Sequence, residues 1–361
     1  MLFRSPSRMI IDEFPATKIN TYKHMKALIC KTAGEFVYQD MEMPKVPAGY
    51  TLLKIKRIGI CGTDLHAFEG TQPFFNYPRI LGHELAAEIV TTDALDFSIG
   101  EQVSFIPYFN CGDCIACRMG KPNCCVSIKV CGVHIDGGMR EYLAVPSYSL
   151  LHGEGLGLNE LALIEPLAIG AHGVSRANVA AGEFVLVIGA GPIGLGTMEF
   201  ARIAGAKVIA MDINDERLNF CREKLNVDFT VNPATENATE KLNTITNGDM
   251  PTIIIDATGS LKAINNAFQY LGHGGRYVLI GLQKGDISFN HPEFHKREAA
   301  LMSSRNATRA DFEFVISCIK NKTIEPLKFI THRVLFDELA VEFPSYLNPE
   351  TGVIKAMVEM K

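Results

Sequence analysis

Hydrophobic and polar positions follow two different rhythms along the chain. Between about residues 25 and 145, short alternating or apolar runs are separated by glycine, proline and asparagine, as at 25–30, 50–58 and 85–90. Short runs bounded by turn residues are typical of β-strands, so this region predicts a β-rich domain. Residues 354–359 predict a further strand at the end of the chain.

From about residue 168 the rhythm changes to strand, glycine-rich turn and helix. Residues 184–188 are all apolar, as in a central parallel strand, and Gly189, Gly191 and Gly194 follow directly. Such glycines allow a tight turn, close approach of the backbone to a pyrophosphate and close packing of the next helix. The pattern therefore predicts a dinucleotide-binding turn.

The segments after this turn have the order that a dinucleotide-binding fold requires. A helix is expected over 195–204 and a strand over 207–211, and two further runs, 252–256 and 274–280, each end in small residues. The chain is therefore predicted to be an α/β protein whose second part is a doubly wound parallel sheet.

Asp212 ends the second of these strands, about 20 residues after the glycine turn, where such folds place the acid that binds ribose. A carboxylate there accepts hydrogen bonds from ribose hydroxyls and repels a 2′-phosphate. We therefore expect NAD rather than NADP as the cofactor. Asp212 also suits a simple helix cap before residues 214–217.

Composition and charge narrow the possible functions. The 361 residues are 47% hydrophobic and carry 35 basic and 40 acidic side chains, so nothing indicates binding to nucleic acid or an anionic membrane. No apolar run reaches the ~18 residues of a membrane span and no signal peptide is evident, which makes the cytoplasm the default location. Residues 1–24 show no clear periodicity and are left unassigned.

A first metal site is predicted from residues 59–66 and the turn before residue 85. Cys61 and the pair His83–Glu84 offer a thiolate, an imidazole and a carboxylate, a donor set that suits a catalytic zinc with one open position. Taken singly, Cys61 fits a buried apolar thiol and His83 a core histidine.

A second metal site is predicted from the loop 111–125, where cysteines cluster. Cys111, Cys114, Cys117 and a cysteine at 124 or 125 supply four thiolates, which close a tetrahedral zinc site completely and leave no position for substrate. This spacing favours a structural zinc in a reducing compartment over disulfides.

These motifs together resemble the zinc-dependent medium-chain alcohol, polyol and threonine dehydrogenases over about residues 25–361. The residues that resemble this family are GICGTDLH (59–66), GHE (82–84), the four cysteines of the loop 111–125, EPLA (165–168), GAGPIG (189–194) and Asp212 at its strand end. It implies a GroES-like catalytic domain at 25–167, a Rossmann domain at 168–306, a return to the catalytic domain at 307–361, and a homodimer or homotetramer. It also favours Cys125 over Cys124 as the fourth thiolate.

The resemblance also implies roles for individual residues. Cys61, His83, Glu84 and Glu165 would surround the catalytic zinc, with Glu165 either a ligand or a partner of zinc-bound water. Asp64 would orient a ligand, and Thr63 and His66 would relay the proton released when the substrate alcohol loses hydride to NAD. Cofactor contacts are implied for residues of the second half of the chain: Gly189, Gly191, Ile193, Gly194, Asp212, Arg217, Leu282 and Arg305.

Within this group, residues 72–79, 132–138 and 291–296, with 304–308, most resemble bacterial L-galactonate or L-gulonate 5-dehydrogenases. The substrate is therefore expected to be a six-carbon sugar acid oxidised at C5, with a neutral polyol or L-threonine as the alternative. Substrate contacts are expected from four side chains: Phe74, Phe75, Arg305 and Asn306. Arg305 would hold the carboxylate bidentately, unless it serves the cofactor or a structural ion pair.

Overall fold

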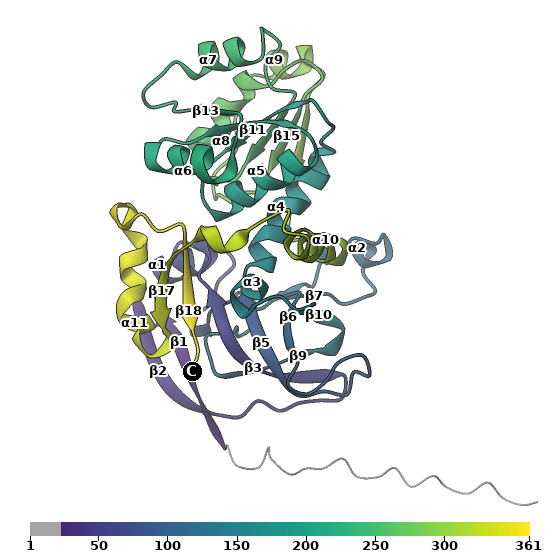
Figure 1. The fold of residues 1–361 in the computed structure, drawn as a ribbon, viewed down its shortest axis with the longest axis vertical. Coiled ribbons are helices and arrows are strands. Elements are labelled where there is room, and N and C mark those ends of the chain that lie inside the picture. Colours follow the sequence, from purple (N-terminus) through teal and green to yellow (C-terminus); the bar gives the residue numbers. More distant parts are fainter. Residues whose placement is uncertain (1–22) are drawn as a thin grey trace, which may run out of the picture.

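The computed structural model describes residues 23–361 and has two parts joined by the helix α4 (Ile164–Ala177). In Figure 1 the β-rich part lies below and the part built on a parallel sheet lies above, with α4 and α10 (Arg309–Lys320) between them. The unassigned lead-in, residues 1–24, lies outside the described residues except for its last two positions. The boundary expected at 167/168 falls inside α4, which continues without a break from one part to the other.

The β-rich part confirms the strands expected at 25–30, 50–58 and 85–90. Its largest sheet has the order β10-β6-β5-β3-β18-β17, with β9 also paired to β3, and a smaller sheet has the order β2-β1-β4. The strands of these two sheets and of the β7-β8 pair are β1 (His24–Thr32), β2 (Glu35–Glu42), β3 (Tyr50–Gly59), β4 (Arg79–Ile80), β5 (Glu84–Thr91), β6 (Gln102–Phe105), β7 (Tyr108–Phe109), β8 (Lys129–Val130), β9 (Tyr142–Pro146), β10 (Leu150–His152), β17 (Ile330–Leu335) and β18 (Lys355–Glu359).

The last strand of the chain belongs to this first sheet. β18 pairs antiparallel with β3, where Met357 lies opposite Gly59, and parallel with β17. Residues near the C-terminus therefore lie beside the end of β3, where the first predicted metal site begins. Two of the short helices in this part are α1 (Gly62–Glu69) and α3 (Leu158–Ala162), α2 (Ile115–Arg118) lies in the cysteine-rich loop, and α11 (Leu339–Glu342) follows β17.

The upper part confirms the doubly wound sheet. Its six strands are all parallel in the order β13-β12-β11-β14-β15-β16, which places the glycine turn after a central strand. The strands are β11 (Phe184–Ile188), β12 (Lys207–Met211), β13 (Phe229–Val231), β14 (Ile253–Asp256), β15 (Arg276–Leu279) and β16 (Ala300–Ser303). The helices are α5 (Pro192–Ile203), α6 (Asp215–Leu225), α7 (Ala238–Ile245), α8 (Leu261–Ala267) and α9 (His291–Lys296).

The glycine turn is built as the sequence predicts. Gly189 has φ +98°, a left-handed conformation that favours glycine, and Gly191 is the N-cap of α5. A Cβ on Gly194 would lie 1.8 Å from the carbonyl oxygen of Gly189, so only glycine lets α5 start this close to the strand. The free N–H groups of the first turn of α5 therefore lie at the carboxyl end of β11, where a pyrophosphate binds in such folds.

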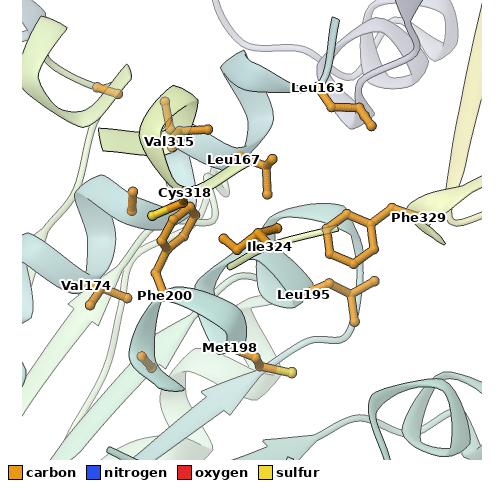
Figure 2. Packing of buried hydrophobic residues seen from close by; sticks show 14 of the residues in the cluster. Leu163, Leu167, Val174, Leu195, Met198, Phe200, Val315, Cys318, Ile324 and Phe329 are labelled. Atoms are coloured by element: carbon orange, nitrogen blue, oxygen red, sulfur yellow. The ribbon is translucent and has the colours of Figure 1, made fainter. Parts of the chain in front are cut away.

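A hydrophobic cluster joins the two parts of the molecule. Figure 2 shows Leu167 and Val174 of α4, with Leu163 directly before this helix, among side chains from α5, α10 and the segment after α10. Burial of these apolar surfaces stabilises both parts at once, because α4 contributes to each. Among residues 23–361, no helix has the length and apolar character needed to cross a membrane.

Substitutions of Phe312 and Phe314 on α10 test how much this hydrophobic cluster contributes to the stability of the fold. Phe312 is fully buried, whereas Phe314 is 45% exposed on the same helix. We predict that Phe312→Ala lowers the free energy of unfolding by about 3–5 kcal/mol, since it removes a buried ring and leaves a cavity. Phe314→Ala should cost less than half as much. Urea denaturation followed by circular dichroism measures both, and equal losses would contradict the assigned core.

Candidate active site

Two neighbouring strand ends bring the first predicted metal ligands together. Gly59, the last residue of β3, lies opposite Glu84, the first residue of β5, and Cys61 and His83 flank this pair in the chain. The ligand atoms of Cys61, His83 and Glu84 all lie within 4.8 Å of one another. A Cβ on Gly59 would lie 2.1 Å from Oε2 of Glu84, so glycine provides the space for this carboxylate.

Asp64 fixes the two turns that carry these ligands. Its Oδ2 accepts the N–H of Cys61 at 3.0 Å, and its Oδ1 accepts the N–H of Gly82 at 3.1 Å. Burial raises the pKa of Asp64, while the charge of His83 and these N–H groups oppose the rise. One buried carboxylate therefore joins the start of α1 to the turn before β5.

Lys355 of β18 is a member of the site that the sequence analysis missed. Its Nζ lies 2.6 Å from both carboxylate oxygens of Glu84 and donates to the carbonyl of Ile60 at 3.0 Å. Although burial lowers the pKa of Lys355, the negative charges of Glu84 and Cys61 raise it above its ordinary value. Glu84 is therefore shared between the predicted metal position and an ammonium group. The one sequence feature that could have indicated this role is a lysine among the apolar residues of segment 354–358.

Glu165 lies in the first turn of α4 and is buried. Its Oε1 accepts a hydrogen bond from the hydroxyl of Tyr108, a second residue that the sequence did not indicate. Burial raises the pKa of Glu165 to about 7, against the opposing charge of His83. Its carboxylate is not within the group formed by Cys61, His83 and Glu84, so both expected roles for Glu165 stay open.

The donor set fits a divalent cation. Nδ1 of His83 is buried and has no hydrogen-bond partner among the described residues. Burial lowers the pKa of His83, but the charges of Cys61 and Asp64 raise it well above its ordinary value. Four groups that can be negative, Cys61, Asp64, Glu84 and Glu165, therefore lie near only two groups that can be positive, His83 and Lys355. A zinc ion held by Cys61 and His83 would supply the missing positive charge.

The second predicted metal site is equally well formed. The Sγ atoms of Cys111 and Cys125 are 3.5 Å apart, as are those of Cys114 and Cys117, and all four lie within 4.8 Å of one another. These separations are too long for disulfides and close to the ~3.8 Å edge of a tetrahedron with Zn–S bonds of ~2.3 Å. Cys124 is exposed and is not a member of the group.

Thr63 and His66 lie three residues apart on α1, so their side chains share one face of the helix. Nδ1 of His66 lies 3.3 Å from the hydroxyl of Thr71, and no hydrogen bond joins His66 to Thr63 among the described residues. The imidazole is exposed to solvent. A proton relay through these two side chains would therefore need a hydroxyl or water between them.

The residues expected to bind the dinucleotide surround the carboxyl edge of the parallel sheet. Asp212 accepts the N–H of Ala190 at 2.7 Å and that of Asn214 at 2.9 Å, so its carboxylate is held rigidly beside the glycine turn. The buried hydroxyl of Ser304 follows β16 and has no partner among residues 23–361. Ile193 lies in the first turn of α5, Arg217 lies on α6, and the side chain of Leu282 is exposed after β15.

Arg305 lies just beyond the carboxyl end of β16 and is exposed. Within residues 23–361 the guanidinium of Arg305 makes no hydrogen bond or ion pair, and only its backbone carbonyl is bonded. The described residues therefore provide no structural ion pair, which was the alternative role for this side chain. The side chain of Asn306, which was expected to contact substrate, donates to the backbone carbonyl of Asn123 at 3.1 Å. Its amide group is therefore engaged in a contact within the protein. Phe74 is exposed, and Phe75 packs edge-on against Tyr77.

Several positive charges act on His134, which the sequence analysis did not single out. Burial, followed by the charges of Arg305, Lys129 and Arg79, lowers the pKa of His134. Its Nδ1 accepts the N–H of Val130 at 3.1 Å, so the neutral ring carries its proton on Nε2. Three N–H groups in segment 137–139 donate to carbonyls in segment 80–82, directly before His83. The segment that carries His134 therefore lies against the turn before His83, and three cations act on its imidazole.

Comparison with known proteins agrees with this architecture. Residues 47–154 match the alcohol dehydrogenase GroES-like domain, and residues 192–321 match the zinc-binding dehydrogenase family. The chain is 43% identical to L-galactonate-5-dehydrogenase of Escherichia coli K12 over 92% of this chain and 98% of that protein. It is 29% identical to a sorbitol dehydrogenase of Halalkalibacterium halodurans, over 87% of this chain and 94% of that protein.

A solved structure adds a three-dimensional match. The alcohol dehydrogenase rspB of Escherichia coli CFT073, in complex with NADH, has a TM-score of 0.87 and 29% identity, covering 94% of this chain and all of that one. The two domain matches, the relatives and the shared fold agree with the open and closed ligand clusters. The chain therefore belongs to the zinc-type medium-chain alcohol dehydrogenases and is an oxidoreductase of the sugar-acid and polyol branch.

Proposed function

We propose that this enzyme oxidises the C5 hydroxyl of a six-carbon sugar acid, L-galactonate or L-gulonate, to the keto acid and transfers hydride to NAD. Two zinc ions per chain are part of the proposal. One is held at Cys61, His83 and Glu84 with Glu165 nearby, and the other by the four cysteines of the loop 111–125.

The observation that carries the substrate assignment is the positive region around His134. The charges of Arg79, Lys129 and Arg305 come from three separate segments and act on one imidazole beside the ligand turn. Arg79 is partly neutralised by Asp136 at 3.2 Å, but Lys129 and Arg305 have no acidic partner within residues 23–361. Unpaired cations beside a catalytic site suit an anionic substrate, and an arginine can bind a carboxylate with two hydrogen bonds. The similarity to an L-galactonate-5-dehydrogenase supports the same reading.

Bound zinc would supply a Lewis acid that favours ionisation of the substrate hydroxyl, and bound NAD would supply the hydride acceptor. The chain's own residues provide position and proton transfer. Asp64 keeps Cys61 and His83 in place, and Lys355 holds Glu84. Thr63 would take the proton from the substrate hydroxyl and pass it, through a bridging hydroxyl, to His66 and solvent.

The preference for NAD is proposed from Asp212. Two backbone N–H groups hold its carboxylate at the end of β12, so it cannot easily turn away from a ribose placed there. A 2′-phosphate would meet this fixed negative charge.

A homodimer or homotetramer is also part of the proposal. β16 forms one edge of the parallel sheet, and the side chains of Ala300, Leu301 and Ser303 are exposed on it. An open strand edge offers unpaired backbone groups to a second copy of the chain.

The substrate assignment predicts faster NADH formation with L-galactonate or L-gulonate than with sorbitol, L-threonine or simple alcohols. Arg305→Ala should lower kcat/KM for the acid by roughly ten- to hundredfold, because a charge-assisted hydrogen bond contributes about 1.5–3 kcal/mol. A neutral polyol should lose much less. Arg333→Ala serves as the control, since Arg333 pairs with Glu359 on β18. Equal losses on both substrates would remove Arg305 from the carboxylate role, and a preference for sorbitol or threonine would overturn the substrate.

The cofactor assignment predicts that Asp212→Ser relaxes the discrimination against NADP. The ratio of kcat/KM for NADP to that for NAD should rise by roughly tenfold, which corresponds to about 1.4 kcal/mol of lost repulsion. Asp215→Ser removes the same charge from an exposed position three residues further on and should leave the ratio unchanged. A wild-type enzyme that is faster with NADP would refute the assignment.

The metal assignment predicts two zinc ions per chain that differ in lability. A chelator should remove the zinc at Cys61 first, because that site keeps an open position, and activity should fall before the fold is lost. Cys61→Ser should retain one zinc and a nearly normal unfolding temperature, whereas Cys125→Ser should lower that temperature. Elemental analysis and thermal unfolding report both. A single zinc in the wild type, or unfolding that precedes inactivation, would be inconsistent with this arrangement.

A further inference from the structure

Asn123 connects the cysteine loop to the segment that carries Arg305. It lies between Cys117 and Cys125 and is 5% exposed. Its Nδ2 donates to the carbonyl oxygen of Arg305 at 2.9 Å and lies 3.2 Å from Nε2 of His172 on α4. In return, the side chain of Asn306 donates to the backbone carbonyl of Asn123 at 3.1 Å. Two hydrogen bonds of opposite direction therefore join the loop to residues 305–306.

The chemistry of its neighbours fixes the orientation of the Asn123 amide. The carbonyl of Arg305 can only accept, so the NH₂ group must face it. The second hydrogen of this NH₂ group then points to Nε2 of His172, which accepts it. Nδ1 of His172 is left to donate to Oδ2 of Asp311 at 2.8 Å. Asp311 in turn caps α10 by accepting the N–H of Thr308. Both hydrogens of the amide are used, and no rotation preserves this network.

The segment that Asn123 holds lies at the carboxyl edge of the parallel sheet. β16 runs parallel to β15, and the N–H of Ser304 donates to the carbonyl of Leu279, so residues 304–306 leave the sheet at its carboxyl edge. Ligands of doubly wound sheets bind at this edge. Asn306 has φ +53°, a conformation that does not extend the strand and turns the chain toward the cysteine loop. The same network reaches α4 through His172, two turns after Glu165.

We propose that Asn123 is a positioning residue, through which the cysteine loop and its metal set the placement of Arg305 at the substrate site. The closed cysteine site would then contribute to substrate affinity in addition to stability. The selectivity for an acid over a neutral substrate rests on the proposed function, whereas the positional link between loop and segment does not.

Asn123→Leu is the sharpest test, because it keeps the size of the side chain and removes both donors. The loss of one hydrogen bond corresponds to about a two- to tenfold change. We expect KM to rise by this factor for whichever alcohol the wild-type enzyme oxidises best, with a smaller change in kcat and with two zinc ions retained. If that substrate is a sugar acid, the loss should exceed that for a neutral polyol. Amide hydrogen exchange in the peptide covering residues 304–308 should also increase.

Ser149→Ala is the matched control. It removes another buried hydrogen bond from a side chain to a backbone carbonyl, at 2.7 Å, in the same part of the molecule. It should lower the unfolding temperature without changing KM or exchange at 304–308. If Asn123→Leu behaves like this control, Asn123 is merely structural and the proposal is overturned.

If Asn123→Leu does not accumulate as folded protein, Asn123→Ser replaces it, since a serine hydroxyl is too short to reach both acceptors. Raised KM and raised exchange at 304–308 would then support the proposal, and unchanged values would overturn it. Failure to oxidise any sugar acid would refute the proposed substrate, and KM for the best alcohol together with exchange at 304–308 would still test the link.

Discussion

A surplus of buried negative charge at the joined ends of β3 and β5 is the constraint on which the site depends. Cys61 and Asp64 lie at the start of α1, Glu84 begins β5 and Glu165 lies in the first turn of α4. These four groups act on two groups that can be positive, the imidazole of His83 and the buried ammonium of Lys355. Buried charges are costly unless they are paired, hydrogen-bonded or bound to a metal. The backbone N–H groups that bind Asp64 and the ion pair between Lys355 and Glu84 offset part of this cost. A divalent cation at Cys61 and His83 would offset much of the rest, which links the stability of the site to its chemistry.

The architecture explains why this surplus can be held so close to a dinucleotide. α4 carries Glu165 in its first turn and packs along α5, so one helix connects the predicted metal position to the cofactor domain. The C-terminal strand β18 pairs with β3 of the first sheet, and this pairing places Lys355 beside Glu84. The cysteine loop reaches the same junction through Asn123. Three separate segments thus converge on the contact between the two domains.

Local signals in the sequence were sufficient to predict the parallel sheet and both groups of metal ligands. Strand ends, the glycine turn and the cysteine spacing depend on neighbours in the chain, so the Rossmann sheet and the groups around Cys61 and Cys111 were predictable. The partners of those groups were not. Lys355 meets Glu84 across 271 positions, and Tyr108 meets Glu165 across 57, with no motif to mark either contact. Asn306, expected at the substrate, instead bonds the backbone of Asn123. Its left-handed conformation is a property of the fold that no residue pattern revealed.

The central claim is that one chain holds two zinc ions in chemically different surroundings, one closed and one open for reaction. X-ray absorption at the zinc edge of the fully loaded enzyme measures the average ligand set directly. A four-sulfur site and a site with one sulfur and three nitrogen or oxygen ligands predict an average of about 2.5 sulfur ligands per zinc. An average near four sulfur ligands would mean that only the cysteine loop binds zinc, and it would contradict the proposed catalytic centre.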